Sequence, residues 1–180
     1  MRMPWTLLGA MALVASGIVA GRSTAGDEPQ DGARMPGEAC IDTHALVKAL
    51  TANAWATKGT GMWDSVGKVS FRLGAGKTLL VQDYAATGTA GDALHGLGVL
   101  KWAPDGKTAS VWWFDDTMKR PIELKGPASE SGYELTGEMA LPDGKPSTAT
   151  FKLAKKGEGF EFTLAADGQV MMTEVYSKAK

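Results

Sequence analysis

The sequence predicts an all-β protein, an antiparallel up-and-down barrel of about ten strands with one short N-terminal helix. Two observations predict this fold. Short segments of alternating apolar and polar residues follow one another from Trp55 to the C-terminus, and glycine-containing turns separate them at regular spacing. A single helical pattern precedes them, so the many strands have to close on one another.

The first 25 residues are typical of a secretory signal peptide. Arg2 gives a basic start, an apolar run extends from Trp5 to Ala20, and small residues suited to signal peptidase precede Gly26 or, alternatively, Gly21. The alternative is an uncleaved membrane anchor, but the apolar run is short for a span and is interrupted by small residues. We therefore expect cleavage, no membrane span in the mature chain, and a periplasmic or secreted location.

Composition divides the remaining chain into a leader and one domain. Residues 26–40 are rich in Gly, Pro and acidic residues, which predicts a flexible leader, and residues 41–180 form the barrel domain. The formal net charge of −1 becomes −3 when Arg2 and Arg22 leave with the signal peptide, and basic residues cluster nowhere, so nothing favours a nucleic-acid partner. Cys40 is the only cysteine, which leaves an idle thiol or a cross-link between two chains.

The helix is predicted in the segment IDTHALVKALTAN, which begins at Ile41. Asp42 or Thr43 can cap its start, and His44 falls in the first turn, where we expect it to face solvent. The helix is too short to be stable alone and needs a surface to cover. The residues expected on its apolar side are Ala45, Leu46, Ala49 and Leu50.

The strands follow in an even series. Their expected ranges are 55–63, 67–73, 77–85, 94–103, 107–115, 119–125, 131–141, 145–155, 158–165 and 169–177. The glycine-rich segment from Gly74 to Thr78 has strands on both sides and lacks phosphate-loop spacing, so it is interpreted as a hairpin turn.

One hairpin register can be predicted from side-chain polarity. The turn LPDGK joins the strands at 131–141 and 145–155. A three-residue loop pairs Leu135 with Phe151 on an apolar face and Glu134 with Lys152 on a charge-matched face. A slip of one residue would destroy this sorting, so the register is well specified.

The same loop length applied to APDGK predicts the register of the hairpin at 94–115. It pairs His95 with Asp115, Leu97 with Trp113 and Val99 with Val111 on one face. The other face then holds Gly96, Gly98, Leu100 and Trp102 opposite Phe114, Trp112, Ser110 and Thr108. Both faces are apolar, so one lines the barrel and the other is covered by the helix or by a second copy of the chain, in a homodimer through the Trp102/Trp112 face.

The loop DDTMKR decides which face of this hairpin lies inside. An even number of loop residues brings Ile122 beside Trp113 and places Arg120 opposite Asp115. An odd number brings Ile122 beside Trp112 instead and turns the His95 face outward. The Asp-initiated four-residue turn favours the first arrangement.

A small-molecule site is the resulting hypothesis, with His95 as a polar anchor that Asp115 orients at one end of an apolar cavity. In the alternative, Asp115 pairs with Arg120, and His95 is a satisfied polar residue near a strand end. The candidate ligand-binding residues are His95, Asp115, Arg120, Trp113, Val99, Trp63, Tyr133, Leu135, Phe151 and Phe162.

Three segments resemble a known family. The segments LHGLGVLKW…WWFDDT, HALVKAL…AW and MMTEVYSK resemble the bacterial domain-of-unknown-function family 1579. The resemblance covers about residues 42 to 178 and rests on strand patterns. It implies an exported barrel of the lipocalin (calycin) type, and it implies no particular activity.

Other chemistries find less support in the sequence. Two histidines are too few for a zinc site, and the expected register turns Ser110 away from His95, which argues against a Ser-His-Asp hydrolase. Resemblance to haem-binding barrels of the nitrobindin kind implies an axial histidine near the C-terminus, where this chain has Met171 and Met172; His95 is the alternative ligand.

Three functions remain open at this point. The first is a non-catalytic barrel that binds a small apolar or amphipathic molecule, and it is the one we favour. The second is a structural or interaction protein that uses an exposed aromatic face. The third is an enzyme or a haem protein that uses His95. The sequence assigns no catalytic residue, metal ligand or cofactor.

Overall fold

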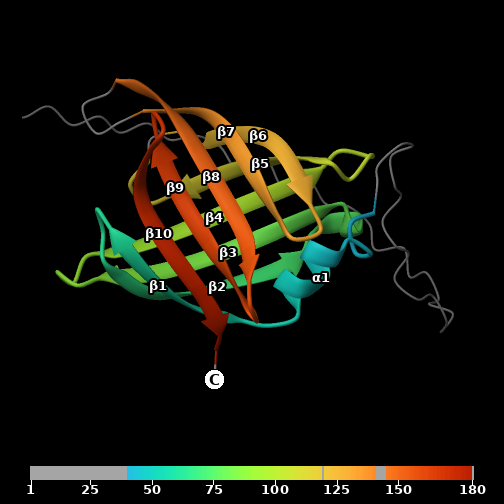
Figure 1. The fold of residues 1–180 in the computed structure, drawn as a ribbon, viewed down its shortest axis with the longest axis horizontal. Helices are drawn as coiled ribbons and strands as arrows, with labels where there is room; N and C mark the ends of the chain where they lie inside the picture. The colour runs from blue at the N-terminus through green and yellow to red at the C-terminus, as the bar shows by residue number, and fades with distance from the viewer. Residues whose placement is uncertain (1–39, 119, 141–144, 180) are drawn as a thin grey trace, which may run out of the picture. The chain divides into compact units, whose positions relative to one another are not determined.

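Ten antiparallel strands form one closed ring in the computed structural model, which describes residues 40–118, 120–140 and 145–179 (Figure 1). Each strand pairs with the next one in the sequence, and the last pairs with the first, which confirms the predicted fold class. The strands are β1 (Trp55–Gly61), β2 (Ser65–Leu73), β3 (Leu79–Gly88), β4 (Ala93–Trp102), β5 (Thr108–Asp115), β6 (Ile122–Ser129), β7 (Gly132–Ala140), β8 (Pro146–Lys156), β9 (Gly159–Ala166) and β10 (Gln169–Lys178).

Pairing of β1 with β10 closes the ring. Its register runs from Trp55 opposite Lys178 to Gly61 opposite Met172, and the amide of Ala179 extends it by donating to the carbonyl of Ala54 at 3.0 Å. Closure leaves no strand edge with unpaired amides and carbonyls, which is how a twisted sheet avoids pairing with other chains.

Side-chain alternation sorts the core from the surface. In β8, Ser147, Ala149, Phe151 and Leu153 are buried, while the residues between them are exposed or half-buried. The predicted β7–β8 register is confirmed, because Leu135 lies opposite Phe151 and Glu134 opposite Lys152. The Glu134 carboxylate and the Lys152 ammonium lie 3.0 Å apart on the outer face. The connection at 141–144 lies outside the described residues.

The helix α1 (Ala45–Thr51) covers one end of the barrel (Figure 1). Leu46, Val47 and Leu50 are buried, and the indole Nε1 of Trp55 donates to the carbonyl of Leu50 at 2.9 Å. Burial is what stabilises so short a helix. The expected apolar side is only partly correct, since Val47 rather than Ala45 or Ala49 joins the two leucines in the core.

The predicted helix cap is wrong. His44 occupies the N-cap position and makes no side-chain cap hydrogen bond. Asp42 instead accepts a hydrogen bond from the Cys40 thiol at 2.9 Å and lies 3.5 Å from the Lys77 ammonium. The expectation that His44 faces solvent is also wrong, because its ring packs on Trp102 with 5.3 Å between ring centroids, and its Nδ1 is buried.

The predicted register of the β4–β5 hairpin is wrong by one residue. Leu97 lies opposite Phe114, and Gly98 lies opposite Trp113. The amide of Ala103 donates to the carbonyl of Thr108 at 2.8 Å, so the loop has four residues instead of three. Within it, the Asp105 carboxylate accepts from the amide of Lys107 and Gly106 adopts a positive φ of 66°, so the wider turn is well satisfied.

The β5–β6 pairing matches the favoured even loop, since Ile122 lies opposite Trp113. Trp113 therefore faces inward as predicted, but the shifted β4 register turns His95 outward, where it is exposed. The same shift separates Trp102 from Trp112. Trp102 is 3% exposed inside the barrel, whereas Trp112 is half-buried on the outer face.

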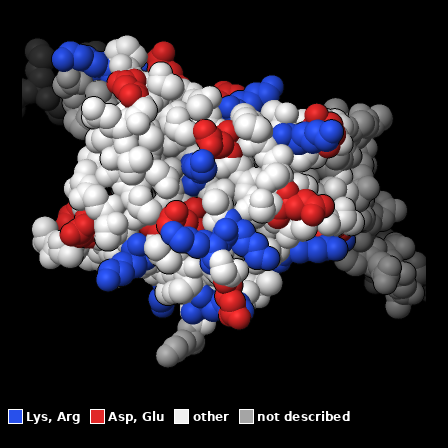
Figure 2. Space-filling view, viewed as in Figure 1, with Lys and Arg blue, Asp and Glu red and all other residues white. Residues whose placement is uncertain are grey.

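Charged side chains of both signs are interspersed over the face shown in Figure 2. Lys and Arg lie among Asp and Glu over most of this face. Exposed cross-strand pairs such as Arg72 with Asp83, 3.4 Å apart, also occur on the barrel. Such exposed pairs contribute little to stability.

We expect Leu50→Ala to destabilise the barrel by about 2–5 kcal/mol, because it removes a fully buried side chain between α1 and the strands. Urea unfolding measures the change. The matched control is Lys48→Ala on the exposed side of the same helix, for which we expect a change within about 0.5 kcal/mol. Equal effects of the two variants would show that α1 does not pack on the barrel in solution.

Candidate functional site

A cavity of about 100 Å³ lies inside the barrel. Several of its lining residues, including Leu94, Met118, Met139, Leu164 and Met172, lie at or just beyond the strand ends opposite α1. The remaining lining residues are Gln82, Tyr84, Val111, Trp113, Asp115, Ile122, Tyr133, Phe151, Phe162, Glu174 and Tyr176. The helix therefore seals one end of the barrel, and flexible methionine and leucine side chains surround the other.

Aromatic rings form a continuous wall around this cavity. Trp113 meets Tyr84 and Phe151 edge to face, with centroids 5.9 and 6.3 Å apart. Phe162 meets Phe151 in the same way at 5.4 Å and stacks on Tyr176 at 6.4 Å. These are the preferred geometries of aromatic pairs, so the wall is rigid and apolar.

Glycines in β4 determine the position of the Trp113 ring. A Cβ atom at Gly96 would collide with the ring, and one at Gly98 would lie 3.4 Å from it. The predicted register placed these glycines opposite Phe114 and Trp112, which is wrong by one residue, because Gly96 lies opposite Asp115 and Gly98 opposite Trp113. The indole Nε1 of Trp113 donates to the Asp115 carboxylate at 2.9 Å, and the amide of Thr117 donates to the same group at 2.9 Å. Asp115 thus holds both the ring and the following turn.

A buried carboxyl forms the polar end of the cavity. Glu174 of β10 is 1% exposed, and the Tyr84 hydroxyl of β3 donates to its Oε1 at 2.5 Å. Such a short distance is typical of a hydroxyl bound to a charged carboxylate. Among the described residues, Tyr84 makes the one hydrogen bond of normal geometry to Glu174, and the Thr57 hydroxyl lies near enough to favour the charged carboxylate.

Burial raises the pKa of the Glu174 carboxyl above its ordinary value of 4.5, and the hydroxyls of Tyr84 and Thr57 offset part of the rise. Burial, and then the charge of Glu174, raises the pKa of Tyr84 and of Tyr176. Burial alone raises the pKa of Tyr133. All three phenols are therefore neutral hydrogen-bond donors at any ordinary pH.

Two further hydroxyls lie beside the Glu174–Tyr84 pair. Thr57 and Ser65 are both buried, yet neither makes a hydrogen bond of normal geometry among the described residues. Gly59 lies opposite both Ser65 and Glu174, and a Cβ atom there would lie 2.5 Å from Ser65 Oγ and 3.3 Å from Glu174 Cγ. Glycine at position 59 therefore leaves room for the Glu174 side chain. The Thr57 and Ser65 hydroxyls keep unused hydrogen-bonding capacity beside it.

The structure brings half of the predicted site residues to the cavity. Those that line it are Trp113, Asp115, Tyr133, Phe151 and Phe162. Leu135 is fully buried nearby without lining the cavity, and Trp63 lies in the β1–β2 connection, where its indole donates to the Asp92 carboxylate. Val99 and His95 lie on the outer face, and Arg120 is exposed before β6.

The predicted pairing of His95 with Asp115 does not occur. The backbone of His95 pairs with Asp116, whose side chain and amide both bond to it, while Asp115 faces the interior. Ser110 now shares the outer face with His95 but lies opposite Lys101, about 20 Å along the strands from His95. No histidine is among the lining residues that the structure describes, so the axial haem ligand considered above is not in the cavity.

The sequence did not predict that Glu174 and Tyr84 line the cavity, nor that methionines lie at the end away from α1. The signal was the alternation in MMTEVYSK, where Met172, Glu174 and Tyr176 share one face. Charged residues are usually exposed, so a glutamate between Met172 and Tyr176 leaves it undecided whether this face points to the core or to solvent.

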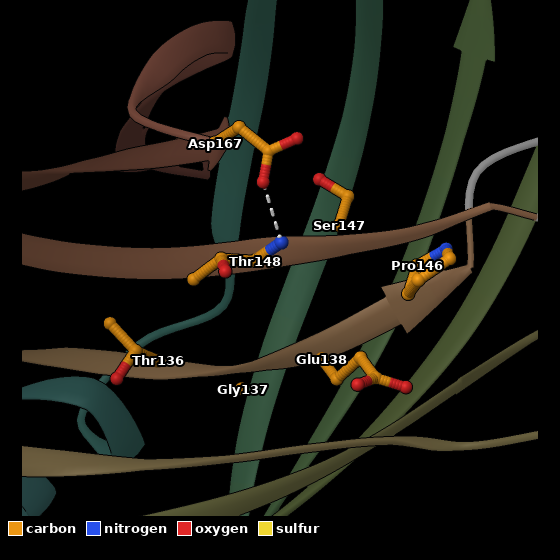
Figure 3. A pocket seen from close by; sticks show the side chains of 7 residues that line it. All are labelled: Thr136, Gly137, Glu138, Pro146, Ser147, Thr148 and Asp167. Carbon is orange, nitrogen blue, oxygen red and sulfur yellow. Dashed lines mark hydrogen bonds between the residues drawn. The ribbon is translucent and has the colours of Figure 1, made fainter.

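A second, larger hollow lies on the surface between β7 and β8 (Figure 3). Its volume is about 330 Å³, and it is open and walled by polar or small residues. Figure 3 shows Asp167 accepting a hydrogen bond from the amide of Thr148, at 2.8 Å. The lining residues are Thr136, Gly137, Glu138, Pro146, Ser147, Thr148 and Asp167. We favour the smaller interior cavity as the site because it is enclosed, apolar and contains a buried ionisable group.

The fold and the cavity define a closed ten-stranded β-barrel whose form is consistent with ligand binding. No known protein family matches the chain. No curated protein matches it either. None of the helices in the described ranges is long and apolar enough to cross a membrane, and no three metal-ligating side chains gather in that part of the chain.

We expect Glu174→Gln to make the barrel more stable than the wild type at about pH 8 and to narrow that difference as the pH falls. The folded-state pKa of Glu174 lies above 4.5, so its contribution to wild-type stability is present below that value and is lost as pH rises through the folded pKa. Gln keeps the shape and the acceptor for Tyr84 without the charge. The midpoints of urea unfolding of both proteins, measured at a series of pH values from about 8 downward, test this prediction.

The control for this comparison is Glu134→Gln on the exposed face of β7, where the carboxylate pairs with Lys152. We expect its stability to follow the wild-type pH dependence. A Glu174→Gln profile that runs parallel to the wild type would show that Glu174 titrates alike in the folded and unfolded chain.

Proposed function

We propose that this chain is an exported, non-catalytic barrel that binds a small apolar or amphipathic molecule in its interior. The observation that carries the proposal is the cavity with an aromatic wall and a single deeply buried carboxyl at one end. An apolar cavity with a few converging polar groups is the usual form of a small-molecule site. The signal-peptide pattern of the first 25 residues supports the exported location, whereas the resemblance to family 1579 adds nothing to it, because no family model matches the chain.

The size of the cavity limits the ligand. At about 100 Å³ it is smaller than the few hundred cubic ångströms of a typical ligand pocket, and somewhat smaller than a cavity that admits benzene. About six heavy atoms is therefore the upper limit for the ligand, and a ligand of that size needs some growth of the cavity. Met118, Met139 and Met172 can change rotamer at the open end, which allows modest growth of the cavity.

The anchor that we propose differs from the one the sequence predicted. Glu174 and Tyr84 take the role first given to His95 and Asp115, because they meet inside the cavity and His95 does not. No Ser, Thr, Cys, Lys or His is among the lining residues that the structure describes, and the phenol of Tyr84 beside Glu174 stays neutral, so a binding function explains the arrangement better than catalysis does.

We expect cyclopentanol, a six-heavy-atom probe, to bind the full chain with Kd of about 1 mM. Methyl-labelled methionines report binding by NMR. Shifts should appear at Met118, Met139 and Met172, while the exposed Met62 stays unchanged. Leu164→Trp fills the cavity and should weaken binding at least about tenfold.

The matched control is Leu97→Trp, the same substitution on the outer face, which should leave the affinity unchanged. Binding that survives Leu164→Trp would place the probe elsewhere. If no probe shifts the three cavity methionines, the interior is closed to ligands and the proposed function is wrong.

The second candidate function is self-association through the outer face of the β4–β5 hairpin. Leu97 and Phe114 lie opposite each other and are 38% and 42% exposed, and Val99 and Trp112 form the next pair on that face. A contiguous exposed apolar patch is typical of an interface. This patch replaces the predicted Trp102/Trp112 face, from which Trp102 is now absent.

We expect Phe114→Ser to shift the chain toward monomer in sedimentation velocity if a second copy covers this patch. Val66→Ser, which removes an apolar side chain that is 64% exposed on β2, is the control and should leave the distribution unchanged. A wild-type chain that is monomeric at all accessible concentrations would eliminate this second function.

A further inference from the structure

The ionisable groups that line the cavity carry one sign. Glu174 and Asp115 are carboxyls, and no Lys, Arg or His is among the lining residues that the structure describes. The other titratable lining groups are the three tyrosines, which stay neutral. Any charge on the described walls is therefore negative, and none of the lining residues in the described ranges is a cation that could balance it.

The two carboxyls differ in how well they are satisfied. Asp115 is half-buried and accepts hydrogen bonds from Trp113 and from the amide and hydroxyl of Thr117. Glu174 is 1% exposed and accepts one hydrogen bond of normal geometry, from Tyr84. A buried carboxylate with so few partners is energetically costly, so a cationic ligand that pairs with it would relieve that cost.

Hydrogen-bonding capacity beside Glu174 is also unused. The hydroxyls of Thr57 and Ser65 are more than nine-tenths buried and make no hydrogen bond of normal geometry among the described residues, although both lie near the Glu174–Tyr84 pair. Each oxygen has lone pairs that can accept a hydrogen bond. Buried groups of this kind are normally satisfied by an ordered water or by a ligand, so the polar end of the cavity favours a donor-rich group.

The rest of the wall suits a cation with an apolar body. The rings of Trp113, Phe151, Phe162, Tyr84 and Tyr176 follow one another around the cavity. Aromatic faces attract ammonium groups through their quadrupoles, most strongly away from water. The same rings pack well against hydrocarbon. An anionic ligand would meet the Glu174 carboxylate with no Lys, Arg or His among the described lining residues to compensate the two negative charges.

We infer that the ligand class is a small protonated amine with at least one N–H bond and an apolar body of about five carbons. Its ammonium group donates to the Glu174 carboxylate, and its hydrocarbon part lies against the aromatic wall. This inference rests on the proposed function, since it names the class of molecule that the same cavity takes. It adds a charge requirement that a simple apolar site does not have.

The test compares three probes of one shape: cyclopentylamine, cyclopentanol and cyclopentanecarboxylate. Binding to the full chain at about pH 8, where the amine is protonated and the acid ionised, is followed by the methyl shifts of Met139 and Met172. We expect the amine to bind at least about tenfold more tightly than the alcohol, and the carboxylate not to bind. Equal affinities of amine and alcohol would overturn the amine assignment and leave the small-molecule function intact.

The variant Glu174→Gln separates charge from shape. It should lower the affinity for cyclopentylamine at least about tenfold and leave that for cyclopentanol within about twofold, because Gln keeps the hydrogen-bond acceptor and removes the charge. Glu134→Gln, on the outer face, should change neither affinity. An undiminished amine affinity in Glu174→Gln would also overturn the assignment.

If Glu174→Gln does not fold, the affinities of the wild type for the three probes still decide the question. A preference for amine over alcohol still supports the inference, and a preference for alcohol or carboxylate still overturns it. Failure of all three probes to shift the cavity methionines has a different meaning, because it would overturn the proposed function together with the inference.

Discussion

The interior of this protein depends on closure of the ring by β1 and β10. An open sheet of ten strands would have two edges and a core exposed along one side. Pairing from Trp55–Lys178 to Gly61–Met172 removes both edges and brings Glu174 into the interior beside Gly59. Tyr84, 90 residues earlier in the chain, then meets the carboxyl across the barrel. The polar end of the cavity exists only in the closed ring.

Closure of the ring also buries an ionisable group that destabilises the fold. Ten strands bury a large apolar surface, which stabilises the fold, while Glu174 opposes folding by losing its water. Tyr84 reduces that penalty with one hydrogen bond and does not cancel it. A chain selected for stability alone would place an apolar residue at this position. The buried carboxyl is therefore the feature on which the proposed recognition role rests.

The sequence predicted the strand number, the helix and the β7–β8 register, because those features follow from alternation and from faces of different polarity. It did not predict the β4–β5 register, because both faces of that hairpin are apolar and a slip leaves the pattern unchanged. The turn APDGK closes there around four residues, with Asp105 satisfying the amide of Lys107. The one additional loop residue shifts the pairing and turns the His95 side chain to the outer face. Glu174 was missed because a buried acid is the exception to the polarity rule.

The position of α1 has a consequence for the rate at which the barrel exchanges its contents. The helix is fixed to one end by three buried side chains and by the bond from Trp55 to the carbonyl of Leu50. In the proposed binding function, a ligand would therefore pass Met118, Met139 and Met172 at the end away from α1. Its residence time would then depend on rotamer changes of these methionines, which occur rapidly, and on release from the deep carboxyl.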